Sequence, residues 1–239
     1  MCWRSWTSRP RPNRAPRPAP ACLRPADPVA EVKICGLSDR AHLRVAVEAG
    51  ARFVGLVFFP KSPRAVTADQ AAALVGDLPM GVAKVGLFVD PADALLDEVL
   101  AAVPLDMIQL HGHESPARVA EVKARHGLPV MKAVGIRGPE DLGQLTDYGV
   151  VADMLLVDAK PAAGAALPGG NGLAFDWRLL VGRRWLRPWM LAGGLTPDNV
   201  AEAVRLTGAG IVDVSSGVES APGIKDEARI RAFFEAARG

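Results

Sequence analysis

The chain alternates short runs rich in β-branched residues with Ala- and Leu-rich stretches from residue 31 to its end. We predict eight strands, which begin near residues 31, 52, 82, 106, 129, 153, 188 and 210. These starts lie 21 to 35 residues apart, about 26 on average, and a strand–helix unit has this length. Eight units of this size favour a closed (β/α)8 barrel, a TIM barrel in a single domain, over an open doubly wound sheet. The first turn, ICGLSD, also lacks the glycine fingerprint of dinucleotide-binding open sheets.

Helices are predicted between these strands, at 38–49, 67–76, 91–102, 116–126, 139–147, 175–181, 197–206 and 226–237. Several are preceded by residues that cap helix N-termini, namely Ser38, Thr67, Ser115 before Pro116, and Thr196 before Pro197. Gly50 and Gly127 follow their helices, where a left-handed C-terminal cap is expected. Asp90 precedes Pro91 and is better interpreted as a helix N-cap than as a catalytic group.

Residues 1–28 are predicted to lie outside the barrel, which we assign to 29–239. The segment contains seven prolines and six arginines without hydrophobic periodicity. Proline at this density prevents both helices and strand ladders, so we expect a disordered extension. Three interpretations stay open: an extension without a role, a start assigned upstream of the true one, and a targeting or basic binding tail.

The charge of the chain argues against a nucleic-acid-binding protein. The arginine-rich start makes the whole chain +2, whereas residues 28–239 carry 22 basic and 25 acidic residues, a net charge of −3. A nucleic-acid-binding face would need excess basic residues. No apolar run approaches the roughly 18 residues that span a bilayer, so we expect no membrane partner. Cys35 is the single cysteine after residue 28, which suits a reducing compartment, and we predict a cytoplasmic location.

Residues at the carboxyl ends of barrel strands face the active site. The polar and glycine residues at these predicted ends are Cys35, Arg64, Gln109, His111, Asp158, Gly193, Gly194, Ser215, Ser216 and Gly217. Two glycine-containing turns follow the seventh and eighth strands, at 193–194 and 215–217, where barrels of this kind recurrently bind phosphate. Backbone N–H groups can approach an anion closely there. The sequence therefore predicts a phosphorylated substrate, although two ordinary tight turns would look similar.

Seven segments together resemble phosphoribosylanthranilate isomerase, a family of the tryptophan pathway. They are VKICGL (32–37), GLVFFPKSPR (55–64), VGLFVD (85–90), IQLHG (108–112), LLVDAK with PGGNGLAFDW (155–160 and 168–177), LAGGLTPDNV (191–200) and IVDVSSGVE (211–219). The resemblance covers 31–239 in the order the family has them. It departs at Asn171, where the family more often carries Thr, and in the variable loop 159–168.

The resemblance implies an Amadori rearrangement of N-(5-phosphoribosyl)anthranilate, a phosphorylated aminosugar, without a cofactor. It makes Cys35 the general base and Asp158 the general acid, and it places the anthranilate carboxylate on Arg64. From the residues alone, other interpretations remain: Cys35 as a small buried apolar residue, Asp158 as a cap of the following loop, and Arg64 as a solvated surface residue. The base requires an environment that supports thiolate, and the acid one that holds a proton near neutral pH.

Asp213 lies within the eighth predicted strand and could contact substrate hydroxyls or be a structural buried acid. Gln109 and His111 share one strand face and are predicted to line the pocket. A metal-dependent epimerase would need several histidine and carboxylate ligands, and only the pair His111 and His113 lies near a strand end. A histidine-pathway isomerase with paired aspartates and a non-catalytic partner subunit are further alternatives. The sequence leaves the oligomeric state open between monomer and homodimer.

Overall fold

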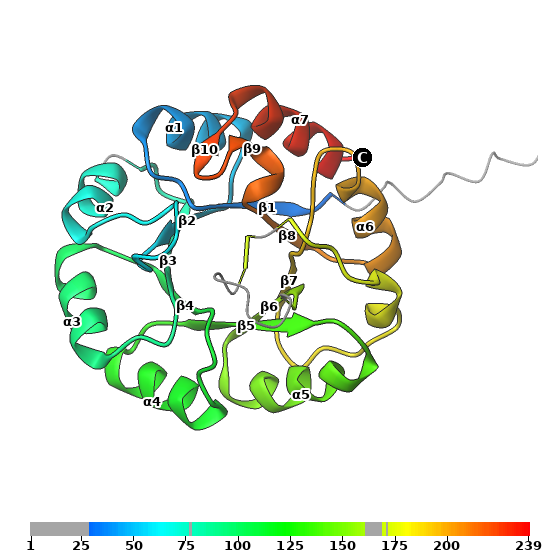
Figure 1. The fold of residues 1–239 in the computed structure, drawn as a ribbon, viewed down its shortest axis with the longest axis horizontal. Helices are drawn as coiled ribbons and strands as arrows, with labels where there is room; N and C mark the ends of the chain where they lie inside the picture. Colours follow the sequence, from blue (N-terminus) through cyan, green and yellow to red (C-terminus); the bar gives the residue numbers. More distant parts are fainter. Residues whose placement is uncertain (1–28, 77, 161–168, 171) are drawn as a thin grey trace, which may run out of the picture.

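The computed structural model describes residues 29–76, 78–160, 169–170 and 172–239. Eight parallel strands follow one another around a closed barrel, and the last strand pairs with the first (Figure 1). The predicted TIM barrel is therefore confirmed. Three segments discussed above lie outside the described residues. They are the predicted extension 1–28, residues 161–168 of the variable loop, and Asn171.

The barrel strands are β1 (Glu31–Cys35), β2 (Phe53–Val57), β3 (Ala83–Phe88), β4 (Met107–Leu110), β5 (Val130–Ile136), β6 (Met154–Ala159), β7 (Trp189–Leu191) and β8 (Ile211–Val214). The α-helices are α1 (Arg40–Ala49), α2 (Ala68–Val75), α3 (Asp93–Ala102), α4 (Pro116–His126), α5 (Leu142–Val151), α6 (Val200–Thr207) and α7 (Glu227–Ala237). Short 3-10 turns are η1 (Pro139–Asp141), η2 (Trp177–Leu180) and η3 (Ser216–Val218), and β9 (Glu219–Ala221) pairs with β10 (Ile224–Lys225) in an antiparallel hairpin.

Strand residues alternate between two apolar layers because successive side chains point to opposite faces. In β1, Val32 and Ile34 join the cluster between the strands and the outer helices. The inner cluster consists of Phe53, Val85, Met131, Ala133, Leu156, Met190 and Ala192. Burying a Leu, Ile, Val or Met side chain contributes about 1.5–3 kcal/mol, so both layers stabilise the ring. Cys35 lies in a third small cluster with Val57 and Leu87.

Four predicted helix boundaries are confirmed. Thr67 accepts a hydrogen bond from the Gln70 backbone in a capping box at the start of α2, and Ser115 caps α4 before Pro116. Gly50 and Gly127 end their helices in the left-handed conformation, with φ of 106° and 66°. These boundaries depend only on neighbouring residues.

Three predicted caps are wrong. Helix α1 is capped by Asp39 instead of Ser38, because the Asp39 carboxylate accepts from the His42 N–H at 2.9 Å. Helix α6 begins at Val200, three residues later than predicted. The reason lies in Asn199, whose side-chain oxygen accepts from the Thr196 N–H at 2.8 Å and holds the preceding residues in a turn.

Asp90 is the third residue wrongly predicted as a helix cap. The N-cap of α3 is Ala92, which makes no side-chain capping bond. Asp90 has a left-handed backbone, with φ of 46°, and its carboxylate instead accepts from the His113 N–H at 2.6 Å. It therefore ties the end of β3 to the loop after β4.

Two predicted helices differ in extent. The predicted helix at 175–181 is only the turn η2, because Gly182 turns the chain with a φ of 70° directly afterwards. The helix predicted at 139–147 is η1 followed by α5, which continues to Val151. Among the described residues, no helix is both long and apolar enough to cross a membrane.

Candidate active site

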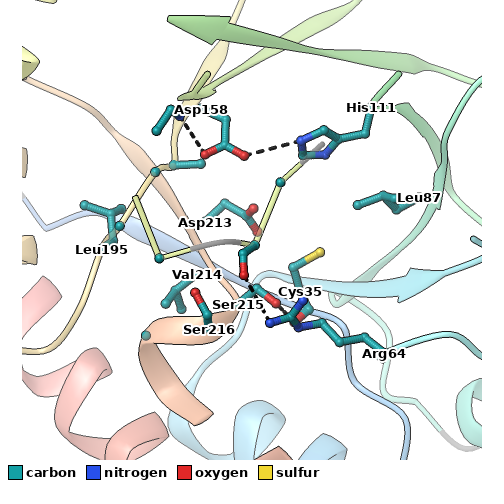
Figure 2. Close-up of a pocket in the computed structure, with 18 of the residues that line it drawn as sticks. Cys35, Arg64, Leu87, His111, Asp158, Leu195, Asp213, Val214, Ser215 and Ser216 are labelled. Carbon is teal, nitrogen blue, oxygen red and sulfur yellow. Dashed lines mark hydrogen bonds and ion pairs between the residues drawn. The ribbon is translucent and has the colours of Figure 1, made fainter. Parts of the chain in front are cut away.

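An open pocket of about 780 Å³ lies at the carboxyl ends of the strands (Figure 2). Ten of the eleven predicted site residues line it: Cys35, Arg64, His111, Asp158, Gly193, Gly194, Asp213, Ser215, Ser216 and Gly217. Apolar walls come from Val57, Phe59, Leu87, Val89 and Leu195. Gln109 does not line the pocket, because it is fully buried behind His111. The structure thus brings together residues from seven of the barrel strands and their loops.

The Cys35 thiol lies at the end of β1 beside two lysines and one carboxylate. Burial raises the pKa of Cys35, and the negative charge of Asp213 raises it further, whereas the cations Lys33 and Lys225 act to lower it. Lys33 is fully buried, and its ammonium group donates to the Asp213 carboxylate at 2.8 Å. The two residues are opposite each other in the β1–β8 pairing. Our sequence reasoning missed Lys33. Its position two residues before Cys35 places both on one strand face, and that spacing could have found it.

Asp158 is the penultimate residue of β6 and forms a pair with His111 from the loop after β4. The His111 Nε2 and Asp158 Oδ2 atoms are 3.3 Å apart, and the other Asp158 oxygen accepts from the Ala159 N–H at 2.7 Å. Behind them the Gln109 amide nitrogen lies 3.0 Å from His111 Nδ1. In this orientation the amide donates, so Nδ1 accepts and the proton of a neutral imidazole lies on Nε2, towards Asp158. The His111 N–H group therefore orients the Asp158 carboxyl group at the pocket surface.

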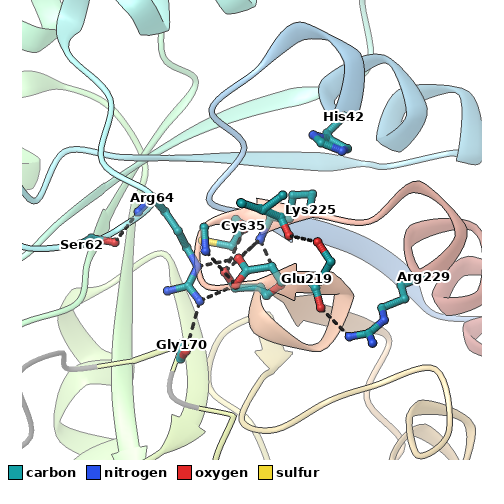
Figure 3. Close-up of polar contacts among 12 residues, drawn as sticks. Cys35, His42, Ser62, Arg64, Gly170, Glu219, Lys225 and Arg229 are labelled. Carbon is teal, nitrogen blue, oxygen red and sulfur yellow. Dashed lines mark hydrogen bonds and ion pairs between the residues drawn. The ribbon is translucent and has the colours of Figure 1, made fainter.

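Arg64 is buried, contrary to a solvated surface role, and is paired with Glu219 (Figure 3). Its Nε and Nη2 groups donate to the two Glu219 oxygens at 2.7 and 2.8 Å, in a bidentate contact. Lys225 donates to the same carboxylate at 2.7 Å. Burial acts to raise the pKa of Glu219, but the hydrogen bonds from Arg64 and the positive charge of Lys225 lower it overall. The sequence analysis named neither Glu219 nor Lys225, which the β9–β10 hairpin brings into contact with Arg64 and Ser215.

The two turns predicted to bind phosphate lie side by side on the pocket wall. Gly193 has a φ of 86°, and a Cβ atom there would lie 2.7 Å from the Ala159 nitrogen, so only glycine fits. The Ser215 hydroxyl donates to the Cys35 carbonyl oxygen at 3.0 Å, and Lys225 donates to the Ser215 carbonyl at 3.0 Å. The turn after β8 is thereby fixed relative to Cys35. Among the residues that the structure describes, no group of three or more His, Cys, Asp and Glu side chains could hold a metal ion.

One pocket of this closed barrel contains a thiol, a His–carboxylate pair and an arginine, and two glycine turns lie beside them. This combination is typical of (β/α)8-barrel enzymes that carry out acid–base chemistry on an anionic substrate. The family model of N-(5'phosphoribosyl)anthranilate (PRA) isomerase matches residues 32–236. The chain belongs to this family.

Relatives and solved structures agree with that assignment. The N-(5'-phosphoribosyl)anthranilate isomerase of Paracoccus denitrificans is 72% identical over 203 residues, which cover 85% of this chain and 94% of that protein. The crystal structure of the Thermotoga maritima phosphoribosyl anthranilate isomerase is similar with a TM-score of 0.79 and 36% identity, over 88% of this chain and 99% of that one. A phosphoribosyl anthranilate isomerase solved with reduced 1-(o-carboxyphenylamino)-1-deoxyribulose 5-phosphate has a TM-score of 0.77 and 34% identity over the same shares.

Proposed function

We propose that this protein isomerises N-(5-phosphoribosyl)anthranilate to 1-(2-carboxyphenylamino)-1-deoxyribulose 5-phosphate, a step of tryptophan biosynthesis. The observation that carries the proposal is the meeting of Cys35 and Asp158 in one pocket, although their strands are not neighbours in the barrel. Membership in the isomerase family and the complex of a related enzyme with a reduced form of this product support the choice of substrate.

Asp158 is proposed as the acid and Cys35 as the base. The acid protonates the ring oxygen of the ribose, and the nitrogen lone pair completes a Schiff base as the ring opens. The thiolate then removes the proton from C2, which gives an enolamine; protonation at C1 and loss of the enol proton yield the ketone. The contact with His111 supports this role, because it fixes the orientation of the Asp158 carboxyl group at the pocket. No electron donor or acceptor is required.

The two charged ends of the substrate have separate candidate sites. The turns containing Gly193 and Ser215 are proposed to bind the phosphate, since both line the pocket at the phosphate position of this fold. Arg64 is proposed to bind the anthranilate carboxylate. Glu219 already occupies the Nε–Nη2 edge of the guanidinium, so the substrate would meet Nη1. Asp213 is proposed to face the sugar hydroxyls.

The test is the loss of phosphoribosylanthranilate fluorescence with purified protein and its variants Cys35→Ala and Asp158→Asn. A positioned general acid or base contributes about 10²- to 10⁴-fold, so we expect each variant to lower kcat by that factor. Asp69→Asn is the matched control, because it makes the same chemical change at an exposed site on the outer helix α2. Wild-type protein that leaves the substrate fluorescence unchanged would refute the function, and near-normal kcat in either variant would refute that residue's role.

The remaining expectations stay predictions. They are the cytoplasmic location, the lack of a nucleic-acid partner, a cofactor-free reaction and a monomeric or homodimeric state. The proposed roles of Gln109, Ser216 and Gly217 in substrate binding also stay untested, and the structure supports Gln109 only as a residue that orients His111.

A further inference from the structure

A lysine side chain inside the barrel is an unusual feature that the proposed reaction does not use. Lys33 has no exposed surface, and its ammonium group donates to the Asp213 carboxylate at 2.8 Å. Burial acts to lower the pKa of Lys33, but the charges of Asp213 and Cys35 and the hydrogen bonds to them together raise it, so the lysine carries its charge. A buried ion pair contributes little net stability, because desolvation of both ions offsets their attraction. Stability therefore does not by itself explain why this pair lies under the pocket.

The Lys33 ammonium lies next to the Cys35 sulfur. The two side chains share one face of β1, and they interact directly. Across the strand pair, Cys35 is opposite Gly55 of β2. A Cβ atom at Gly55 would lie 2.9 Å from the sulfur and 3.2 Å from the lysine nitrogen, so these two atoms lie within about 6 Å of each other. The glycine leaves the space that both groups occupy.

We propose that Lys33 is a positioning residue for the isomerisation, a buried cation that stabilises the thiolate of Cys35 and is itself held in place by Asp213. This inference rests on the proposed function of Cys35 as the base. A thiol becomes a base only as thiolate, and an adjacent cation favours the charged form. Asp213 acts in the opposite direction on the thiol, so the lysine and the aspartate together set how readily Cys35 loses its proton.

The charged groups that face Cys35 come from three elements. They are Lys33 on β1, Asp213 on β8 and Lys225 on β10, whereas Gly55 and Val57 of β2 and Leu87 of β3 bring no charge. The Lys225 ammonium group donates hydrogen bonds to Glu219 and to two oxygens of Ser215, and burial lowers the pKa of Lys225. Lys33 has the larger effect on the thiol of the two lysines. The proposal therefore predicts that Lys33 lowers the pKa of Cys35 more than Lys225 does.

The experiment titrates Cys35 directly in the full chain. Iodoacetamide alkylation is followed from pH 6 to 10, and the peptide with Cys35 is quantified by mass spectrometry, because Cys2 and Cys22 also react. In Lys33→Met the midpoint should move to higher pH, and alkylation at pH 8 should slow about tenfold, which corresponds to one pH unit. The rising limb of kcat/KM should move in the same direction. Lys132→Met, which removes another buried and acid-paired lysine, should leave the midpoint where it is.

Asp213→Asn keeps a hydrogen-bond acceptor for Lys33 and removes the negative charge, so its midpoint should move to lower pH. This variant also serves if Lys33→Met does not fold. Opposite shifts in the two variants support the proposal; if Lys33→Met does not fold, a downward shift in Asp213→Asn supports it. An unchanged midpoint in folded Lys33→Met, or an upward shift in Asp213→Asn, would overturn it. Alkylation needs no turnover, so this result is separate from any failure of the proposed isomerase activity.

Discussion

Two buried lysines in this barrel are paired with acids but face opposite sides of the strand ring. Lys33 on β1 points inward, to Asp213 and Cys35. Lys132 on β5 alternates with Met131 and Ala133 of the inner cluster, so it points outward, under the helices. There it donates to Glu114 at 2.9 Å and to the Gly112 carbonyl at 2.8 Å, and it lies 5.4 Å from the centre of the Tyr148 ring.

The difference shows that the same ion pair serves different purposes on the two sides of a strand. Glu114 accepts from the N–H groups of Asp90 and Gly112, so the outer pair fixes the loop that carries His111. The inner pair, Lys33 and Asp213, lies at the wall of the pocket, and its carboxylate does not fix a loop as Glu114 does. Asp213 also lines the pocket, so water can reach it, whereas Glu114 is covered. We therefore expect the outer pair to matter for folding and the inner pair for chemistry.

The largest predicted effect is on stability, in Lys132→Met. Removal of one partner leaves Glu114 as an uncompensated buried charge, which costs about 3–5 kcal/mol in proteins. Denaturant unfolding should show this loss in the free energy of unfolding, and Lys33→Met should lose less because pocket water can solvate Asp213. The double variant Lys132→Met/Glu114→Gln should recover part of the loss. Equal losses in the two single variants would erase the distinction between the outer and inner pairs.

A smaller effect is predicted for substrate binding in Glu219→Gln. The neutral amide cannot hold Arg64 and Lys225 by ionic bonds, so the guanidinium loses its fixed position at the pocket. A charge-assisted hydrogen bond contributes about 1.5–3 kcal/mol, so we expect KM to rise about tenfold or more with a smaller change in kcat. Steady-state kinetics checks this split. Glu235→Gln on the exposed face of α7 is the control, and a fall in kcat at constant KM would contradict a binding role for Arg64.

The smallest predicted effect is the acid dependence of stability. Because the pKa of Glu219 is lowered in the folded protein, its contribution is fully present above the ordinary carboxyl pKa, about 4.3. That contribution is lost as the pH falls through the folded pKa. Between pH 5 and 2.5 the unfolding free energy of the wild type should therefore decrease more steeply than that of Glu219→Gln. Parallel curves would show that the Glu219 pairs are weaker than their distances suggest.

The sequence predicted much of the fold and many of the residues that line the pocket because both follow from short-range patterns. Strand and helix alternation, with its spacing, predicted the closed barrel, and the ends of strands pointed to Cys35 and Asp158. The predicted helix starts were wrong where a side chain forms a hydrogen bond with a residue other than the expected capping partner. Asn199 delays the start of α6, and Asp90 bonds to the loop after β4 instead of capping α3. Gln109 has the right strand face but lies too deep to reach the pocket.

What the sequence determined by itself is the ring of strands, the family and the position of each candidate group along its own strand, since these depend on local periodicity and motif. Only the tertiary structure decided how the charges are paired. Lys33 and Asp213 are 180 residues apart, and Arg64 and Glu219 are 155 apart, so no local pattern connects them. They meet because ring closure joins β1 to β8 and the following hairpin brings Glu219 to Arg64, and burial strengthens each interaction between charges.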